Sequence, residues 1–300
     1  MNAGFGLRVS GSGMADRPHT DLSCHSRVPC SLITLSRNPK PETRNPKPDQ
    51  AMSNSDKRSF KIWRGNKDGG QFQEYSAEIT TGMVVLDAVH QIQATQAPDL
   101  ACRWNCKAGK CGSCSAEING KPRLMCMTRM ETLPPGEVTI QPLKAFPNIR
   151  DLVTDVSWNY TVNKQIQPLT YDPKELNADG TFTMYQEEVD RSQEFRKCIE
   201  CFLCQDTCHV LREHDLHAEF AGPRFFVRTA SLEMHPMDTA DRTEWLRKKG
   251  NIGYCNITKC CTEVCPEHIH ITDNAIIPLK ERVIDRYFDP VGRVWEWAHA

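Results

Sequence analysis

The sequence lacks two features that would place it in common functional classes. It contains no apolar run of the roughly 18 to 20 residues that a membrane-spanning helix needs, and its mean hydropathy is -0.54. It also has no excess of basic residues, since 37 Lys and Arg stand against 38 Asp and Glu and the formal net charge is -1. We therefore expect a chain that is soluble or held at a membrane by partners, and no nucleic-acid partner.

A nucleotide-binding signature is missing as well. No predicted strand is followed by G-x-G-x-x-G, the pattern typical of folds that bind FAD or NAD, and no feature points to a dicarboxylate site. We expect no catalytic residue for carbon chemistry on this chain. Such chemistry would reside in a partner.

Cysteine, by contrast, is abundant. The chain has 15 cysteines, an odd number, and all but two fall in two blocks with short, regular spacings. This distribution favours metal ligation in a reducing compartment over a framework of disulfides. Cys24 and Cys30 lie outside both blocks and are interpreted as incidental.

The distribution of hydrophobic residues predicts four segments. Residues 1–52 have little hydrophobic periodicity and are predicted to be a disordered extension, upstream of a true start at Met52. An organellar transit peptide is the alternative, which the acidic residues and prolines of this segment fit poorly. We then expect a first domain over residues 53–147, a helical domain over 148–290 and a C-terminal tail over 291–300.

The first domain is predicted to be a small α+β fold. Alternating apolar residues predict a hairpin over 59–79 and a strand over 138–140, and a second hairpin over 116–127 turns at Asn119-Gly120. Apolar residues at helical spacing predict a helix over 85–92. From Leu152 onward the spacing is helical, which predicts an all-helical second domain.

The first cysteine block has the spacing of a 2Fe–2S site. Cys106, Cys111 and Cys114 follow the C-x4-C-x2-C pattern of plant-type ferredoxins, and Cys126 stands further along. A tight loop can supply three thiolates to the cluster while a neighbouring strand supplies the fourth. Structural zinc is the alternative, although zinc sites usually present paired C-x2-C knuckles. Cys102 is a spare thiol that could replace Cys106.

The second block contains two runs of the bacterial ferredoxin kind. The first run is complete, with the spacing C-x2-C-x2-C-x3-C, and the second has Thr258 where its second cysteine should stand. In two-cluster ferredoxins the fourth cysteine of such a run binds the other cluster. Crossing the runs in this way gives one site of four thiols (Cys198, Cys201, Cys204 and Cys265) and one of three (Cys208, Cys255 and Cys261).

The number of thiols predicts the cluster type. Four thiolates hold a 4Fe–4S cube, whereas a site whose fourth corner faces Thr258 is predicted to lose that iron and hold 3Fe–4S. Cys260 leaves an alternative open, because it stands beside Cys261 and could be drawn in as a fourth ligand. A neighbouring residue on a helical turn is expected to point elsewhere.

A 2Fe–2S domain followed by a helical domain with one complete and one defective ferredoxin run resembles the iron–sulfur subunit of succinate:quinone oxidoreductases, the succinate dehydrogenases and fumarate reductases. The resemblance covers roughly residues 58–290. It implies an N-terminal β-grasp domain of the plant-type 2Fe–2S ferredoxin kind, followed by an all-helical domain like bacterial ferredoxins. It also implies electron transfer through 2Fe–2S, 4Fe–4S and 3Fe–4S centres, between a flavoprotein that converts succinate or fumarate and a membrane quinone.

The same resemblance implies partners and a location. We expect a subunit that carries FAD, a membrane-anchor subunit of the cytochrome b type and a quinone. The chain would lie at the membrane periphery, on the cytoplasmic face of a bacterial inner membrane, with the mitochondrial matrix side as the alternative. His209 follows Cys208 where many relatives carry proline, and it is the candidate quinone contact. Alternatively, His209, His214 and His217 are exposed histidines or lie just outside the ligands.

Two other functions use the same cysteines. The chain could be the iron–sulfur subunit of a different flavin-dependent dehydrogenase or reductase, which the substrate of a copurifying flavoprotein would reveal. It could also be a zinc-stabilised adaptor, which would contain zinc without iron or acid-labile sulfide.

Overall fold

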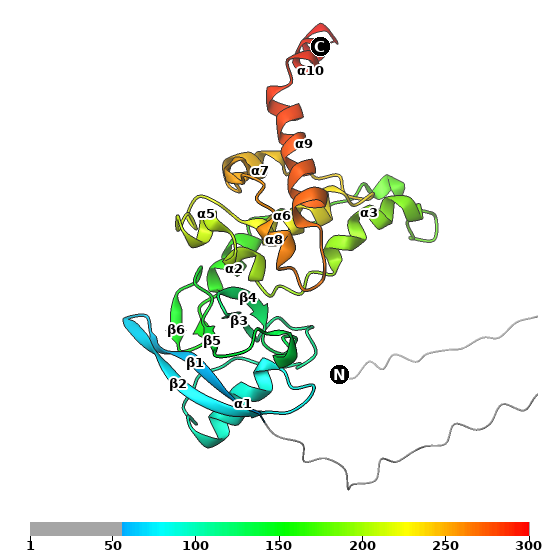
Figure 1. Ribbon diagram of the computed structural model, residues 1–300. Coiled ribbons are helices and arrows are strands. Elements are labelled where there is room, and N and C mark those ends of the chain that lie inside the picture. The colour runs from blue at the N-terminus through cyan, green and yellow to red at the C-terminus, as the bar shows by residue number, and fades with distance from the viewer. Residues whose placement is uncertain (1–55, 300) are drawn as a thin grey trace, which may run out of the picture. The chain divides into compact units, whose positions relative to one another are not determined.

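The computed structural model describes residues 56–299, which form a sheet-bearing half followed by a helical half (Figure 1). The predicted extension over residues 1–52, with Cys24 and Cys30, lies outside the described residues. The mixed α+β class predicted from the sequence is confirmed, because a sheet domain precedes a helical region.

The sheet-bearing half contains one sheet of seven strands. The strands run in the spatial order β4-β3-β5-β1-β6-β7, with β2 paired to β1. β1 pairs antiparallel with β2 and parallel with β5, and β3 pairs antiparallel with both β4 and β5. Their bounds are β1 Asp56–Asn66, β2 Gly69–Ile79, β3 Ser115–Ile118, β4 Lys121–Leu124, β5 Val138–Gln141, β6 Asn148–Arg150 and β7 Val153–Thr154.

Local sequence signals account for the main elements of this half. Phe60 and Ile62 of β1 are fully buried in the same core as helix α1 (Val85–Thr95), whose own buried residues recur at helical spacing. Asn119 and Gly120, with φ of 50° and 73°, make the tight turn between β3 and β4 that positive φ at both central residues permits. The two predicted hairpins, the helix and the strand over 138–140 are therefore confirmed.

The region after residue 147 differs from the prediction. β6 pairs with β1 through Arg150 and Asn66, and it also pairs with β7, so the sheet continues past the expected end of the first domain. The helical spacing at Leu152 is misleading, because helix α2 begins only at Ser157. Strands of two or three residues are too short to produce the alternation by which strands are recognised.

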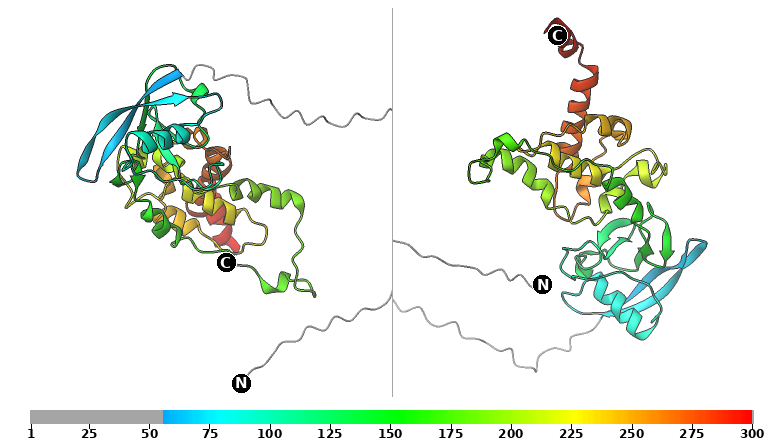
Figure 2. Two further views of the ribbon diagram at one scale, coloured as in Figure 1. Left: turned by 90° about the horizontal axis from the view of Figure 1, so that it is seen from below. Right: turned by 180° about the vertical axis from the view of Figure 1, so that it is seen from behind.

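The helical half surrounds the second cysteine block. It contains α2 Ser157–Asn163, α3 Gln186–Arg196, α4 Leu203–Asp206, α5 His209–Arg212, α6 Pro223–Glu233, α7 Thr243–Lys248, α8 Cys260–Glu263, α9 Ile277–Phe288 and α10 Pro290–His299, with a π-helical turn at Ile271–Ile276. Figure 2 shows α9 and α10 leaving this half as its last elements, so the expected C-terminal tail includes a helix. Within residues 56–299, no helix has the length and apolarity required to cross a bilayer.

A buried ion cluster holds the outer helices of this half together. The Arg242 side chain is 1% exposed and lies 3.1 Å from Glu233 and 2.7 Å from Asp238, two carboxylates that are also buried. It also donates to the backbone carbonyls of Gln167 and Pro168 at 2.7 and 2.9 Å. Arg242 therefore joins the loop after α2 to the end of α6.

Replacing this arginine should destabilise the helical half strongly. Arg242→Met leaves the buried carboxylates of Glu233 and Asp238 without their main partner, which typically costs about 3–5 kcal/mol. Denaturant unfolding followed by tryptophan fluorescence measures the loss. Lys248→Ala is the matched control, because it removes an exposed ion pair with Glu244 and should change the unfolding midpoint little. Equal effects of the two substitutions would contradict this account.

Candidate metal centres

Three thiols of the first group, those of Cys106, Cys111 and Cys114, lie in the loop between α1 and β3, and the fourth, that of Cys126, follows β4. Backbone N–H groups of Ala108 and Lys110 donate to Cys106 Sγ at 3.4 and 3.3 Å, and the Cys126 N–H donates to Cys114 Sγ at 3.5 Å. Cys111 interacts electrostatically with Cys106 and Cys114. The structure therefore brings together the four thiols predicted for the 2Fe–2S site, with amide groups directed at two of the sulfurs.

The thiols of this loop have contrasting environments. A hydrogen bond from Ser113 is the main cause that lowers the pKa of Cys111 to about 6, whereas burial raises the pKa of Cys114 to about 12. Cys102 is set apart: burial alone raises its pKa to about 12, and its thiol donates to the backbone carbonyl of Arg103 at 3.7 Å. This geometry favours Cys106 over Cys102 as the first ligand.

The second group of thiols surrounds a cavity in the helical half. Cys198, Cys201 and Cys204 line it together with Cys265, which comes from the other run. Burial raises the pKa of Cys201 to about 12 and also raises the pKa of the buried Cys204 well above its usual value. The crossed pairing inferred from spacing is thus the pairing that the cavity brings together.

The third group surrounds a separate cavity and contains one thiol more than predicted. Cys208, Cys255, Cys260 and Cys261 line it, together with Thr258. The expectation that Cys260 points elsewhere is wrong, since its sulfur lies 3.2 Å from the Thr258 hydroxyl. Burial raises the pKa of Cys208 to about 11 and that of Cys261 to about 12.

The two cysteine runs share one backbone conformation. In the first run the second and fourth residues after Cys198, which are Glu200 and Phe202, have φ of 56° and 60°. The residues at the same places after Cys255, Ile257 and Lys259, have φ of 62° and 63°. Left-handed residues alternating with right-handed ones turn successive amide groups toward one concave side, which suits an anionic centre. By this register Thr258 corresponds to Cys201.

The thiols fit clusters better than single metal ions. The sulfurs of the second and third groups surround cavities, as ligands of a multi-iron core must. Thiolate is also the usual ligand of both 2Fe–2S and 4Fe–4S centres.

The three groups of thiols follow one another in space, each beside the next. A Cβ added to Gly112, in the first loop, would lie 2.7 Å from Cys201 Cα, so the two loops touch at their backbones. Ser115 Oγ strengthens this contact by hydrogen-bonding the Cys201 carbonyl at 2.9 Å. In the helical half, the second and third cavities share the short helices α4 and α8, because each helix carries a thiol of one cavity and is followed by a thiol of the other. The order is therefore first loop, second cavity, third cavity.

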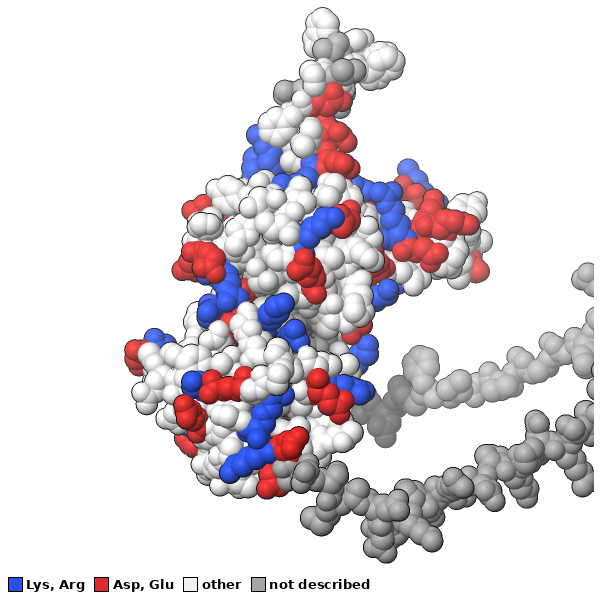
Figure 3. All heavy atoms as spheres, in the orientation of Figure 1, with Lys and Arg blue, Asp and Glu red and all other residues white. Residues whose placement is uncertain are grey.

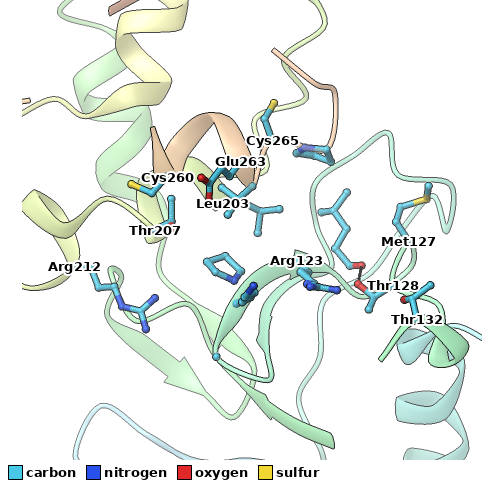
Figure 4. A pocket seen from close by; sticks show the side chains of 16 residues that line it. Arg123, Met127, Thr128, Thr132, Leu203, Thr207, Arg212, Cys260, Glu263 and Cys265 are labelled. Carbon is cyan, nitrogen blue, oxygen red and sulfur yellow. Dashed lines mark hydrogen bonds between the residues drawn. The ribbon is translucent and has the colours of Figure 1, made fainter. Parts of the chain in front are cut away.

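A cleft of about 550 Å³ separates the β3–β4 hairpin from α4 and α8. Figure 4 shows Arg123 and Arg212 on its lower side and Cys260, Glu263 and Cys265 on the opposite side. Figure 3 shows basic side chains gathered along the junction of the two halves. The cleft therefore approaches both candidate centres of the helical half from the surface.

Buried charges beside this cleft were not predicted. Glu117 on β3 and Asp206 on α4 are fully buried, and Arg212 lies 2.6 Å from Glu117 and 3.9 Å from Asp206. Burial raises the pKa of Asp206 to about 7. A hydrogen bond from the Ala145 N–H acts in the opposite direction but is the smaller effect. No spacing rule connects these three residues, because they meet only when the halves pack together.

The three candidate histidines do not form one group. His209 lines the third cavity, and its Nε2 lies 3.0 Å from the Asn256 amide nitrogen. The His214 ring centroid is 6.3 Å from that of His209. His217 instead packs edge-on against Trp158 and bonds Asp215 at 2.8 Å.

Comparison with known families covers both halves. Residues 59–161 match the family described as "2Fe-2S iron-sulfur cluster binding domain", and residues 194–269 match "4Fe-4S dicluster domain". The two matched segments contain the first cysteine block and both runs of the second. Thus the presence of domains for 2Fe–2S and 4Fe–4S clusters is supported independently of the spacing argument.

Whole-chain comparison gives named relatives. The chain is 31% identical over 201 residues to a fumarate reductase iron-sulfur subunit of Mycobacterium tuberculosis, covering 66% of this chain and 80% of that protein. It is 29% identical to the fumarate reductase iron-sulfur subunit of Haemophilus influenzae, and the match covers 73% of this chain and 90% of that protein. A similar match, to an uncharacterized iron-sulfur protein of Methanococcus maripaludis, spans 42% of that protein's length.

A solved structure is also similar. A chain of the Mycobacterium smegmatis Sdh1 complex in the apo form shares 61% sequence identity with this chain at a TM-score of 0.75. The match covers 78% of this chain and 98% of that one.

The contact between the first two thiol loops should tolerate no side chain at Gly112. Its φ of 66° and the nearby Cys201 backbone both oppose a Cβ, so Gly112→Ala should separate the loops and lower the melting temperature and the cluster content. Gly120→Ala is the matched control, because Gly120 has φ of 73° and nothing within 4 Å of an added Cβ. It should cost only the left-handed strain, about 1–2 kcal/mol.

The melting temperatures of the two variants are compared by thermal unfolding, and their cluster contents by near-ultraviolet and visible circular dichroism. If Gly112→Ala were no more harmful than Gly120→Ala, the loops would not be in the contact described.

Proposed function

Because the chain belongs to the iron–sulfur subunits of succinate dehydrogenases and fumarate reductases, we propose that it carries electrons between a FAD flavoprotein and a membrane quinone through three iron–sulfur centres. The observation that carries this proposal is the succession of three groups of thiols, each adjoining the next. Such a succession divides the distance between two remote redox partners into short steps.

The ligands are assigned from these three groups. Cys106, Cys111, Cys114 and Cys126 would hold the 2Fe–2S centre, and Cys198, Cys201, Cys204 and Cys265 the 4Fe–4S centre. Cys208, Cys255 and Cys261 would hold a 3Fe–4S centre, since Thr258 stands where a complete run has its second cysteine. Iron–sulfur centres supply one-electron transfer when bound.

The protein's own residues fix the order and the environment of these steps. Gly112 lets the first loop approach Cys201, and helices α4 and α8 each lie between the second cavity and the third. Backbone N–H groups that donate hydrogen bonds to the sulfurs of Cys106 and Cys114 stabilise negative charge on these sulfurs. Burial disfavours charge on Cys114 in the first half and on Cys201 and Cys261 in the second, so bound iron would be needed to keep these thiols deprotonated.

The domains and partners complete the proposal. We infer a β-grasp ferredoxin domain from the strand order β2-β1-β5-β3-β4 with α1 against it, extended by β6 and β7 to about Thr154. This domain would face the flavoprotein, and the helical domain would face a membrane-anchor subunit of the cytochrome b type. His209, at the third cavity, is the candidate contact for quinone. The chain would then sit peripherally on the cytoplasmic face of a bacterial inner membrane.

Single cysteine variants test the crossed ligands. Cys265→Ala, although in the second run, should abolish the 4Fe–4S signal in electron paramagnetic resonance and leave the oxidised 3Fe–4S signal. Cys208→Ala, although in the first run, should do the reverse. If each substitution removed the centre of its own run, the crossed assignment would be wrong.

The function itself is tested on the complex purified anaerobically with its partners. Succinate should reduce the centres, a quinone should reoxidise them, and the chain should contain about nine irons, the sum of the three cluster types. Far fewer irons, or a copurifying flavoprotein that reduces the centres only with another substrate, would contradict the proposal.

A further inference from the structure

The thiol of Cys260 occupies an unexpected place. It lines the third cavity together with Cys208, Cys255 and Cys261, the three proposed ligands of the 3Fe–4S centre. Its sulfur lies 3.2 Å from Thr258 Oγ1. Thr258 also lines this cavity, so the thiol lies beside the one side chain that replaces a ligand.

The repeated backbone of the two runs identifies that corner. Positive φ values at Glu200 and Phe202 recur at Ile257 and Lys259, which aligns Thr258 with Cys201. Cys201 is a proposed ligand of the 4Fe–4S centre, so the Thr258 position is where a fourth iron would be held. The only side-chain atom of Thr258 that could bind iron at this corner is its hydroxyl oxygen, a poorer ligand for this iron than a thiolate. Cys260 brings a sulfur to within 3.2 Å of it.

We propose that Cys260 is a conditional fourth ligand, which lets the third centre take up one ferrous ion and become a 4Fe–4S centre. This inference rests on the proposed function, because it presumes a 3Fe–4S centre in that cavity. In the step, Cys260 loses its thiol proton to solvent and its sulfur bonds the incoming ferrous ion. A reduced 3Fe–4S core has no net charge and the product core has charge 2+, so no electron is transferred.

The position of Cys260 explains why the ligand is conditional. It begins helix α8 two residues after the corner, and its sulfur is hydrogen-bonded to Thr258 instead of standing at the Thr258 position itself. The fourth iron would therefore be held less firmly than the three others and be lost on oxidation.

The surroundings of Cys260 also give iron a route. Cys260 is half-buried and lines the surface cleft as well as the third cavity. Figure 4 shows its sulfur directed away from the middle of that cleft, with Glu263 nearby on the same helix. Cys260 therefore stands between the third cavity and the surface cleft, which the Glu263 carboxylate also lines and through which a ferrous ion would arrive.

The test uses the complete complex, isolated anaerobically and reduced with dithionite. Ferrous ion enriched in iron-57 is added and the excess is removed. The sample is then mildly reoxidised with a quinone, and Mössbauer and electron paramagnetic resonance spectra are recorded beside those of a sample treated in the same way without iron. In the wild type the iron-57 should enter a 4Fe–4S environment, about one ion per chain, and the 3Fe–4S signal should fall by most of its intensity. Oxidation with ferricyanide should restore that signal.

Three variants separate the explanations. Cys260→Ser should retain the 3Fe–4S signal as isolated and take up at least tenfold less iron-57 into a cluster. Cys102→Ser, which removes a thiol outside the cavities, should behave as the wild type. Thr258→Cys supplies a thiol at the corner itself, and should take up the fourth iron and keep it through oxidation, which shows that the site accepts a cube.

The outcomes distinguish this inference from the function beneath it. Normal iron uptake by Cys260→Ser, or no uptake by a wild type that shows the 3Fe–4S signal, would overturn the role of Cys260 and leave the electron-transfer function intact. Absence of a 3Fe–4S signal in every isolated sample would overturn the cluster assignment itself. Loss of all centres from Cys260→Ser would overturn the conditional role, because a reserve ligand is dispensable for assembly.

Discussion

The structure depends on one electrostatic constraint: thiols must be buried close together and yet give up their protons. Burial and neighbouring sulfurs favour the protonated form, as the raised pKa values of Cys201, Cys204 and Cys261 express. Only the positive charge of iron can reverse this preference, and metal binding then releases protons. The fold of the helical half is a solution to holding these sulfurs in place until that happens.

The backbone contributes as much to that solution as the side chains. Each cysteine run places two non-glycine residues in the left-handed region, at a cost that a loop without a function would not carry. In return, the short helices α4 and α8 begin at equivalent places after the first cysteine of their runs. The helical half is therefore built around two copies of one loop, and the ligand positions of these copies differ at Cys201 and Thr258.

Sequence was sufficient where the determinants are local. The cysteine spacing predicted which thiols meet, even across runs, because the spacing reflects the loop that a cluster requires, and the Asn119-Gly120 turn follows from its own dihedral angles. Sequence failed where the determinants are tertiary. Residue spacing along the sequence does not reveal tertiary neighbours. Such neighbours determine the short strands β6 and β7, the burial of Arg242 and the direction of the Cys260 side chain. The ligand roles themselves remain predictions.

The crossed arrangement of the two runs has a consequence for how the chain reaches its final form. A bound centre that joins Cys204 to Cys265 closes a long loop, and one that joins Cys208 to Cys255 closes a second loop nested within it. Both loops contain α6 and α7, so these helices are stapled at their ends in the same manner as by covalent cross-links. Each bound centre should therefore stabilise this half by closing a loop, and chains that hold both centres should resist cellular proteases best.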